Sequence, residues 1–397
     1  MVNVQEAADI IGKNLYKPIV QPVSLTEATG KVLAENVVAD RDFPPFNRVS
    51  MDGLALQYDI WKNGQREFQM EDIQAAGEPQ KKLKDPRHGI EIMTGAILPE
   101  GTDTVIRYED LNISGGVASV ITDEIQLGMN VHRQGQDATK NELLLEPGII
   151  LSPAEIALLA SVGKAIVKTY SFPRTAIVAS GDELVEINQI PLAHQIRRSN
   201  TYAIESAMKI LGWKGTPFHM PDVREILQRS LKQITTDHDV IILSGGVSKG
   251  KFDYIPEVLE EIGIQKLFHQ VSQRPGKPFW FGVSAQGKVV FALPGNPVST
   301  YMCFYRYIRP WLLQSLGVIP KPSYAILARE ITFQPKLTYF LQVRVANESG
   351  QLVAYPDAGG GSGDFANLKK VDGFLELPME KTDFKAGEAF PYIPFRL

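Results

Sequence analysis

The sequence predicts a multidomain protein of α/β plus β class: a central three-layer α/β domain with a mostly parallel sheet, a helical and extended lobe, a β-rich insert and a C-terminal β-barrel-like domain. Two observations support this class. The chain has 397 residues, more than one ordinary core holds. Strand–helix repeats in the middle of the chain also give way, on both sides, to short β-branched runs rich in Gly and Pro. We expect the helical lobe at 1–42 and 137–173, the insert at 43–136, the α/β domain at 174–316 and the barrel at 317–397.

The N-terminal lobe is predicted to be helical. One helix is expected at about 3–15 and a second over 24–37, where Ser24 and Glu27 have the spacing of a capping box. A third helix is expected over 150–162. These three segments would form one lobe that the β-rich insert interrupts.

The insert and the C-terminal region both have the pattern of short strands. In the insert the strand-like segments are IEIMTGAIL, DTVIRYED and GVASVITDE. In the C-terminal region they are YAILAREI, TYFLQVRVA, GFLELPM and FPYIPFRL, and the Gly-rich segment 357–365 between them is expected to be a flexible loop.

The central region predicts a largely parallel sheet with amphipathic helices. Its buried strands are TAIVAS, DVIIL and KVVFAL, and polar turns follow them at 180–184, 244–253 and 294–299. Because loops at the carboxyl ends of parallel strands converge on the ligand crevice, we expect these three turns to lie together.

The second of these turns has the composition of a phosphate-handling turn. Gly245 and Gly246 can bring backbone N–H groups close to an anion. Charged and hydroxyl side chains follow at once, and Asp253 could hold a divalent cation. The polar side chains after the two glycines are Ser248, Lys249, Lys251 and Asp253.

A Walker A loop is the first alternative, because residues 245–251 match its first seven positions. Phe252 stands where that loop needs a hydroxyl, and Pro256 indicates that the helix starts later, at about 256–262. The second alternative is a simple tight turn whose lysines are solvated. One motif does not decide among the three interpretations.

Two further segments point to anion binding. Asn296 is a good N-cap and Pro297 suits the first helical position, so nearby N–H groups would point into the crevice, although a well-capped helix alone explains the pair. In QRPGKP, Arg274 and Lys277 are cations in a segment that is stiffened by prolines. This stiffness lowers the conformational entropy lost when the segment binds an anion.

Composition excludes several classes. A net charge of −4 argues against a general nucleic-acid binder, and the single cysteine, Cys303, excludes an internal disulfide and a cysteine-ligated zinc site. The six histidines are not at metal-ligand spacing, and no apolar run could span a bilayer. We expect a cytoplasmic protein with no nucleic-acid or membrane partner.

At this point the sequence resembles the molybdopterin molybdenumtransferases and the related E domain of gephyrin. The resemblance covers nearly the whole chain and depends on the order of its motifs. These are SMDG (50–53), MTGA (93–96), SGDEL (180–184), SGGVSKGKFD (244–253), RPGKP (274–278), LPGNPVS (293–299) and GGS (360–362).

The resemblance implies an activity and its requirements. Molybdate would be inserted into adenylylated molybdopterin with release of AMP, with Mg²⁺ as the divalent cation. The protein would be an elongated homodimer, each active site built from the α/β and barrel domains of one subunit and the insert of the other. A molybdopterin adenylyltransferase would be the upstream partner.

The resemblance also implies roles for individual residues. The implied catalytic residues are Asp52, Thr94, Asp137, Glu183 and Asp253. The implied substrate-binding residues are Ser244, Gly245, Gly246, Ser248, Arg274, Lys277, Pro294, Asn296, Pro297, Arg344 and Ser362. The implied metal ligands are Asp182, Glu183, Asp222 and Asp253.

Two positions differ from the family's usual residues. Val223 stands where the family often has a second aspartate, and Gln342 stands where it usually has an arginine thought to hold molybdate. Arg344, two residues along the same strand face, is expected to reach similar space.

Two other functions compete with the transferase. A molybdopterin adenylyltransferase would consume ATP and would not require the insert or the barrel. A non-catalytic scaffold would tolerate neutral residues at Asp52, Glu183 and Asp253, and all three carboxylates are present.

Overall fold

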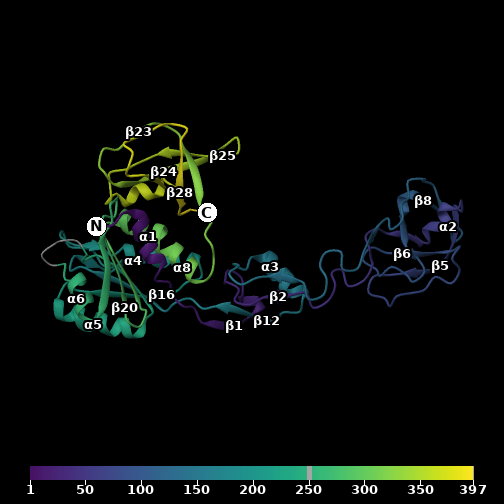
Figure 1. Ribbon diagram of the computed structural model, residues 1–397, viewed down its shortest axis with the longest axis horizontal. Helices are drawn as coiled ribbons and strands as arrows, with labels where there is room; N and C mark the ends of the chain where they lie inside the picture. The colour runs from purple at the N-terminus through teal and green to yellow at the C-terminus, as the bar shows by residue number, and fades with distance from the viewer. Residues whose placement is uncertain (248–252, 397) are drawn as a thin grey trace. The chain divides into compact units, whose positions relative to one another are not determined.

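The structure is a computed structural model that divides into two compact units (Figure 1). It describes residues 1–247 and 253–396. Within that part of the chain no helix is long and apolar enough to cross a membrane. The four predicted domain boundaries stay a prediction. The first unit comprises Met1–Ala34, Pro147–Ser152 and Ile166–Leu397, and the second comprises Glu35–Glu146 and Pro153–Ala165.

The first unit contains a six-stranded sheet in the order β16-β13-β17-β21-β20-β18. The first four strands run parallel, and β20 and β18 run antiparallel to their neighbours. TAIVAS, DVIIL and KVVFAL map onto β13, β17 and β21, which are buried along their whole length. The strand bounds are β13 (Thr175–Ser180), β16 (Gly215–Met220), β17 (Val240–Ser244), β18 (Ile264–Gln270), β20 (Pro278–Ser284) and β21 (Val289–Leu293).

Helices cover both faces of this sheet, which gives the predicted three layers. Ile177 and Ile242 pack in a core with α1, α4, α7 and α8, whereas Val178 and Leu243, one residue along, pack in a second core with α5 and α6. Figure 1 shows α5 and α6 together on one side of the sheet. The helix bounds are α1 (Val4–Gly12), α4 (Asn200–Ile210), α5 (Arg224–Asp237), α6 (Ile255–Glu261), α7 (Pro297–Cys303) and α8 (Arg309–Ser315), with a π-helical turn at Phe304–Ile308 between the last two.

The C-terminal region forms a closed five-stranded barrel, as predicted. The ring runs β24-β25-β22-β28-β26 and closes because β26 pairs with β24. The short strand β19, which precedes β20 in the chain, adds to the outside of β24 and so joins the α/β domain to the barrel. The bounds are β19 (Gln273–Arg274), β22 (Ser323–Leu327), β24 (Thr338–Glu348), β25 (Gln351–Pro356), β26 (Gly373–Leu377), β28 (Ala389–Pro394) and the 3₁₀ turn η4 (Phe365–Lys369).

One predicted N-terminal helix is present and the second is not. α1 begins after Asn3, which forms a true capping box with Glu6. The helix predicted over 24–37 is wrong: only a 3₁₀ turn, η1 (Leu25–Glu27), forms there, and Ser24 makes no capping bond. The residues beyond it are extended instead, because they form β-bridges to distant residues, Val32 with Ile150 and Leu33 with Thr169. Tertiary pairing overrides local helix propensity here.

The second unit is β-rich, with a six-stranded sheet in the order β7-β4-β6-β5-β9-β8. The three strand-like segments of the insert supply β6, β7 and β9. The helix predicted over 150–162 is α3 (Pro153–Ser161). The remaining bounds are β4 (Gly53–Leu56), α2 (Tyr58–Lys62), β5 (Glu67–Gln74), β6 (Gly89–Ile92), β7 (Thr104–Arg107), η2 (Tyr108–Asp110), β8 (Leu111–Ser114) and β9 (Val117–Val120).

Short two-stranded ladders complete the secondary structure. In the first unit they pair β1 (Val20–Ser24) with β12 (Ile166–Tyr170), β14 (Leu184–Val185) with β15 (Ile196–Arg197), and β23 (Ile331–Thr332) with β27 (Asp383–Phe384). In the second unit they pair β2 (Val37–Val38) with β11 (Leu143–Leu145), and β3 (Arg48–Val49) with β10 (Val131–His132).

Candidate functional site

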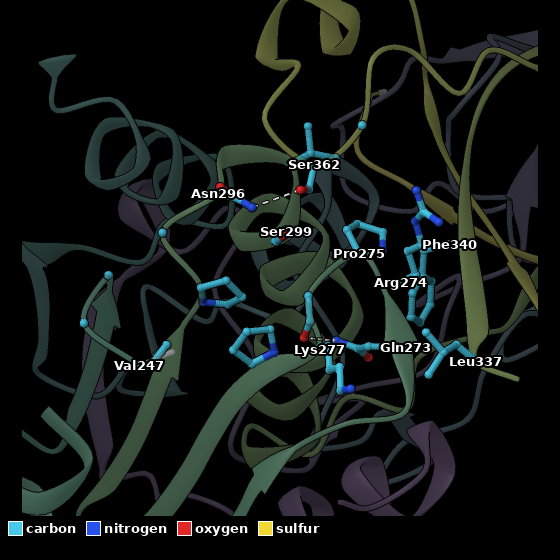
Figure 2. A pocket seen from close by; sticks show the side chains of 18 of the residues that line it. Val247, Gln273, Arg274, Pro275, Lys277, Asn296, Ser299, Leu337, Phe340 and Ser362 are labelled. Atoms are coloured by element: carbon cyan, nitrogen blue, oxygen red, sulfur yellow. Dashed lines mark hydrogen bonds between the residues drawn. The ribbon is translucent and has the colours of Figure 1, made fainter. Parts of the chain in front are cut away.

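A cavity of about 730 Å³ lies at the carboxyl ends of β13, β17 and β21. The three polar turns that follow these strands all contribute to its lining, as expected for a largely parallel sheet. The rest of the lining comes from the loop Gln273–Pro278, barrel strand β24 and the Gly-rich segment 357–365 (Figure 2). The cavity therefore lies where the α/β domain meets the barrel.

The turn after β17 requires its two glycines. Gly245 and Gly246 have φ values of 98° and 65°, which L side chains rarely adopt. A Cβ on Gly245 would lie 2.6 Å from the carbonyl oxygen of Ser180, so the two strand-end turns approach each other through bare backbone. Ser248, Lys249 and Lys251, named in the sequence prediction, lie outside the described residues.

Three carboxylates line the cavity. Glu183 and Asp222 come from the β13 and β16 ends of the sheet, and Asp253 from the segment before α6. Asp222 also accepts a hydrogen bond from the hydroxyl of Ser180. Negative charge is therefore concentrated on the sheet side of the cavity.

The four predicted metal ligands do not form a ready-made metal centre. Asp182 lies outside the cavity lining, and its Oδ1 accepts the backbone N–H of Asp222 at 3.2 Å. Among the described residues no three His, Cys, Asp or Glu side chains are close enough together to hold a metal ion. The four-carboxylate set stays a prediction, and in this structure Asp182 supports the turn that carries Asp222.

Two cations share the cavity with these carboxylates. Arg274 and Lys277 line the cavity from a loop that a buried glutamine holds in shape. Gln273, fully buried, donates to the carbonyl of Gly276 at 2.8 Å and accepts the Tyr307 hydroxyl at 2.5 Å. The sequence prediction missed Gln273 and Tyr307, because neither belongs to a charged or glycine-rich pattern.

The turn after β21 is tied to the barrel. Asn296 occupies the N-cap position of α7 and Pro297 its first turn, but the side chain of Asn296 makes no capping bond. Its Nδ2 donates to the hydroxyl of Ser362 at 2.9 Å, and the N–H of Val298 donates to the carbonyl of Ser362 at 3.1 Å. Asn296 and Pro297 therefore occupy the expected positions at the start of α7, but the Asn296 side chain bonds Ser362 and does not cap the helix. The Gly-rich loop occupies that end of the helix, as Figure 2 shows for Asn296 and Ser362.

A second asparagine joins two of the turns. Nδ2 of Asn200, at the start of α4, donates to the Ser244 hydroxyl and to the Gly295 carbonyl, each at 2.8 Å. Ser199 precedes α4 without a side-chain capping bond. Ser244 and Pro297 line a smaller adjoining cavity of about 270 Å³ and not the main one.

The barrel contributes Gln342 where the resemblance suggested an arginine. Gln342 is 5% exposed, lines the cavity and donates to the carbonyl of Ala358 at 3.2 Å. Arg344 does not line the cavity, and its guanidinium lies 5.0 Å from the ring centroid of Tyr355. Gln342 and Arg344 lie on the same face of β24. Arg344 is two residues farther along the strand and does not reach the cavity.

The second unit holds the other three predicted catalytic residues. Oδ1 of Asp52 accepts the backbone N–H of Thr94 at 2.5 Å, and the hydrogen bonds from Thr94 lower the pKa of Asp52. Asp137 lies in a separate contact of the same unit, where its Oδ1 is 2.8 Å from Nε2 of His132. Asp52 and Thr94, from the motifs SMDG and MTGA, are therefore hydrogen-bonded to each other.

Together these features define a class: a multidomain protein in which a cavity lined by carboxylates and cations lies between an α/β domain and a β-barrel. Three family models match consecutive parts of the chain: the MoeA N-terminal region (domain I and II) at 2–163, the probable molybdopterin binding domain at 176–314 and the MoeA C-terminal region (domain IV) at 324–395. The chain belongs to the molybdopterin molybdenumtransferase (MoeA) family.

Relatives of similar length agree with this membership. A molybdopterin molybdenumtransferase of Synechocystis is 38% identical over 396 residues, 99% of each chain, and one of Haemophilus influenzae is 29% identical over 379 residues, 94% of this chain and 93% of the relative. Two crystal structures of molybdopterin biosynthesis MoeA proteins from Pyrococcus horikoshii cover 100% of both chains, with TM-scores of 0.82 at 28% identity and 0.85 at 24% identity.

Proposed function

We propose that this chain inserts molybdate into adenylylated molybdopterin and releases AMP. The family membership supports a transferase of molybdenum cofactor biosynthesis. The observation that supports the particular reaction is the cavity, because two cations and three carboxylates line it together. These residues are Arg274, Lys277, Glu183, Asp222 and Asp253. A substrate with a phosphoanhydride and an oxyanion needs both kinds of charge within one site.

The cations have a defined part in this reaction. Cleavage of the bond between the adenylate and the molybdopterin phosphate develops negative charge on phosphate oxygens. Arg274 and Lys277 would hold those oxygens or the molybdate, and the buried Gln273 keeps their loop in place for that purpose.

A Mg²⁺ ion fits the carboxylates that line the cavity. Magnesium in phosphate-transfer sites is commonly held by one or two carboxylates together with substrate phosphates and water, so no complete protein cage is needed. One or two of Glu183, Asp222 and Asp253 would hold the ion together with substrate phosphate, and the ion would neutralise phosphate charge. Asp182 would act by supporting the backbone at Asp222.

We further propose a homodimer and an upstream partner. The resemblance of the SMDG and MTGA motifs supports a catalytic role for Asp52 and Thr94, and the bonds from Thr94 favour an ionised Asp52. Asp137 is proposed as a third catalytic residue on the same ground. A molybdopterin adenylyltransferase would supply the adenylylated substrate, and the cytoplasm is the proposed location.

One assay tests the reaction. Purified protein is incubated with adenylylated molybdopterin, Mg²⁺ and molybdate, and AMP release is followed together with formation of active cofactor. The proposal expects both products without ATP consumption. Binding of the substrate with neither product would favour a scaffold, and ATP-dependent formation of adenylylated molybdopterin would favour an adenylyltransferase.

A further inference from the structure

The main cavity has one polar side and one aromatic side. The strand-end turns supply backbone groups and carboxylates, whereas strand β24 and the residue before it supply Leu337, Tyr339 and Phe340. Figure 2 shows Leu337 and Phe340 grouped with Arg274, across the cavity from Val247. A ligand that fills the cavity therefore meets anion-binding groups at one end and aromatic surface at the other.

Tyr339 is held as a fixed ring. Its ring stacks on that of Phe333, with centroids 4.2 Å apart and planes 12° apart. Phe333 is 8% exposed and does not line the cavity, whereas Tyr339 does, so Phe333 is a buried support for one face of the tyrosine ring. A ring that is already ordered costs a ligand little conformational entropy when the two stack.

Arg274 lies next to this ring. β19 pairs with β24 in parallel, and the register places Arg274 opposite Tyr339. The Arg274 guanidinium carbon is also 5.9 Å from the ring centroid of Phe333. A guanidinium can stack on a flat π-system while it binds an anion, so Arg274 suits the junction between a ring and a phosphate.

We propose that Tyr339 determines specificity by stacking on the fused pterin ring of the substrate. Phe333 supports the tyrosine, and Arg274 flanks the stacked ring. The phosphate end of the substrate then lies toward the turns at Gly245 and Gly295. This inference rests on the proposed function, which supplies the pterin, and it gives the substrate one orientation in the cavity.

The contact is tested with two simple probes on the full chain. Unsubstituted pterin carries the fused ring and no phosphate, and AMP carries a phosphate and no pterin. Dissociation constants for both are measured, by fluorescence for pterin and by calorimetry for AMP. The variants are Tyr339→Leu, which removes the ring, and Tyr339→Phe, which keeps it. The matched control is Tyr324→Leu, because Tyr324 lies in the same barrel, is 57% exposed and does not line the cavity.

Stacking of a base on an aromatic side chain predicts that Tyr339→Leu weakens pterin binding roughly tenfold. Tyr339→Phe and Tyr324→Leu should stay within about twofold of wild type, and the affinity for AMP should not change in any variant. If Tyr339→Leu does not fold, Tyr339→Met serves, because its unbranched side chain adapts to the barrel.

Two results would overturn the inference. One is pterin binding that is unchanged when the ring is removed, and the other is an equal loss of pterin and AMP binding, which would indicate a general distortion of the cavity. The proposed function fails separately, by absence of AMP release from the adenylylated substrate in the wild-type protein. The pterin measurement therefore stands whether or not turnover is found.

Discussion

The side-chain amide of Asn296 donates a hydrogen bond to the hydroxyl of Ser362 at 2.9 Å, and this bond joins the α/β domain to the barrel. The carbonyl of Ser362 also accepts the N–H of Val298, so this serine satisfies one N–H group in the first turn of α7 from outside the helix. The Gly-rich loop is thus a wall of the cavity with a specific anchor, and not a free linker.

A double-mutant cycle measures that anchor. Asn296→Ala and Ser362→Ala each remove the side-chain bond, so each should lower the free energy of unfolding by about 1 kcal/mol, and the double variant should lose little more than either single one. Chemical unfolding followed by tryptophan fluorescence gives these values. Asn188→Ala, at an exposed position, is the control and should be neutral. Strictly additive losses would mean that the two side chains act independently.

The loop that carries the two cations depends on a buried pair. Tyr307→Phe removes the hydroxyl that donates to Gln273 and leaves the Oε1 atom of a fully buried glutamine without a partner. An unsatisfied buried acceptor costs about 1–3 kcal/mol, so unfolding should become easier by that amount. Because Arg274 and Lys277 then lose a fixed backbone, the KM for adenylylated molybdopterin should rise severalfold.

The same Tyr→Phe substitution at a solvent-exposed tyrosine separates the effect on stability from the effect on KM. Tyr324→Phe removes a hydroxyl from a side chain that is 57% exposed, so both the unfolding curve and KM should stay as in wild type. A loss of stability in Tyr307→Phe with no change in KM would show that the Gln273 bond does not position the cations.

The order of the strands and turns could be predicted from the sequence, but the bonds between turns could not. Apolar runs that end in Gly, Pro and Asn place the turns at strand ends, and the parallel sheet then brings them together. Asn200, by contrast, bonds Ser244 and Gly295, which are 44 and 95 residues away, and Asn296 bonds Ser362, 66 residues away. Each asparagine looks like an ordinary helix cap in local sequence, because nothing nearby indicates a distant partner.

The helix predicted over 24–37 does not form for the same reason, because its distant partners cannot be recognised from the local sequence. The segment 24–37 has helical spacing, yet Val32 and Leu33 pair with Ile150 and Thr169. Such pairings are decided by the fold as a whole, and a helix propensity worth a few tenths of a kcal/mol per residue does not outweigh them.

Asp239, at the start of the strand that carries the SGG turn, predicts a pH dependence of stability. Burial raises its pKa, but bonds from Arg174 and Lys288 outweigh that effect and lower the pKa to about 2 from the ordinary 3.8. A carboxyl whose pKa is lower in the folded state stabilises the fold above the unfolded value, and this contribution disappears as the pH falls through the folded value. The stabilisation should therefore be complete above about pH 4 and lost toward pH 2.

The measurement compares wild type with Asp239→Asn. Since the Asp239 side chain is 22% exposed, the difference in the free energy of unfolding should be about 1–2 kcal/mol at pH 6 and should shrink steadily toward pH 2. Chemical unfolding at a series of pH values gives the difference. Asp237→Asn, an exposed neighbour at the end of α5, is the control for the loss of one carboxylate charge. If the difference in the free energy of unfolding between wild type and Asp239→Asn is the same at every pH, the ion-pair explanation is contradicted.

Asp253 gives the sharpest test of the proposed magnesium site. It lines the cavity with Glu183 and Asp222, so removal of its charge should weaken Mg²⁺ without disturbing the core. Asp253→Asn should reduce AMP release at least a hundredfold at limiting Mg²⁺ and raise the Mg²⁺ concentration for half-maximal rate, with an unchanged unfolding curve. Glu257→Gln, in the first turn of α6 and outside the cavity lining, is the charge-matched control and should keep the wild-type Mg²⁺ dependence. If Asp253→Asn lowers the rate equally at all Mg²⁺ concentrations, Asp253 acts on the substrate directly and the metal is held elsewhere.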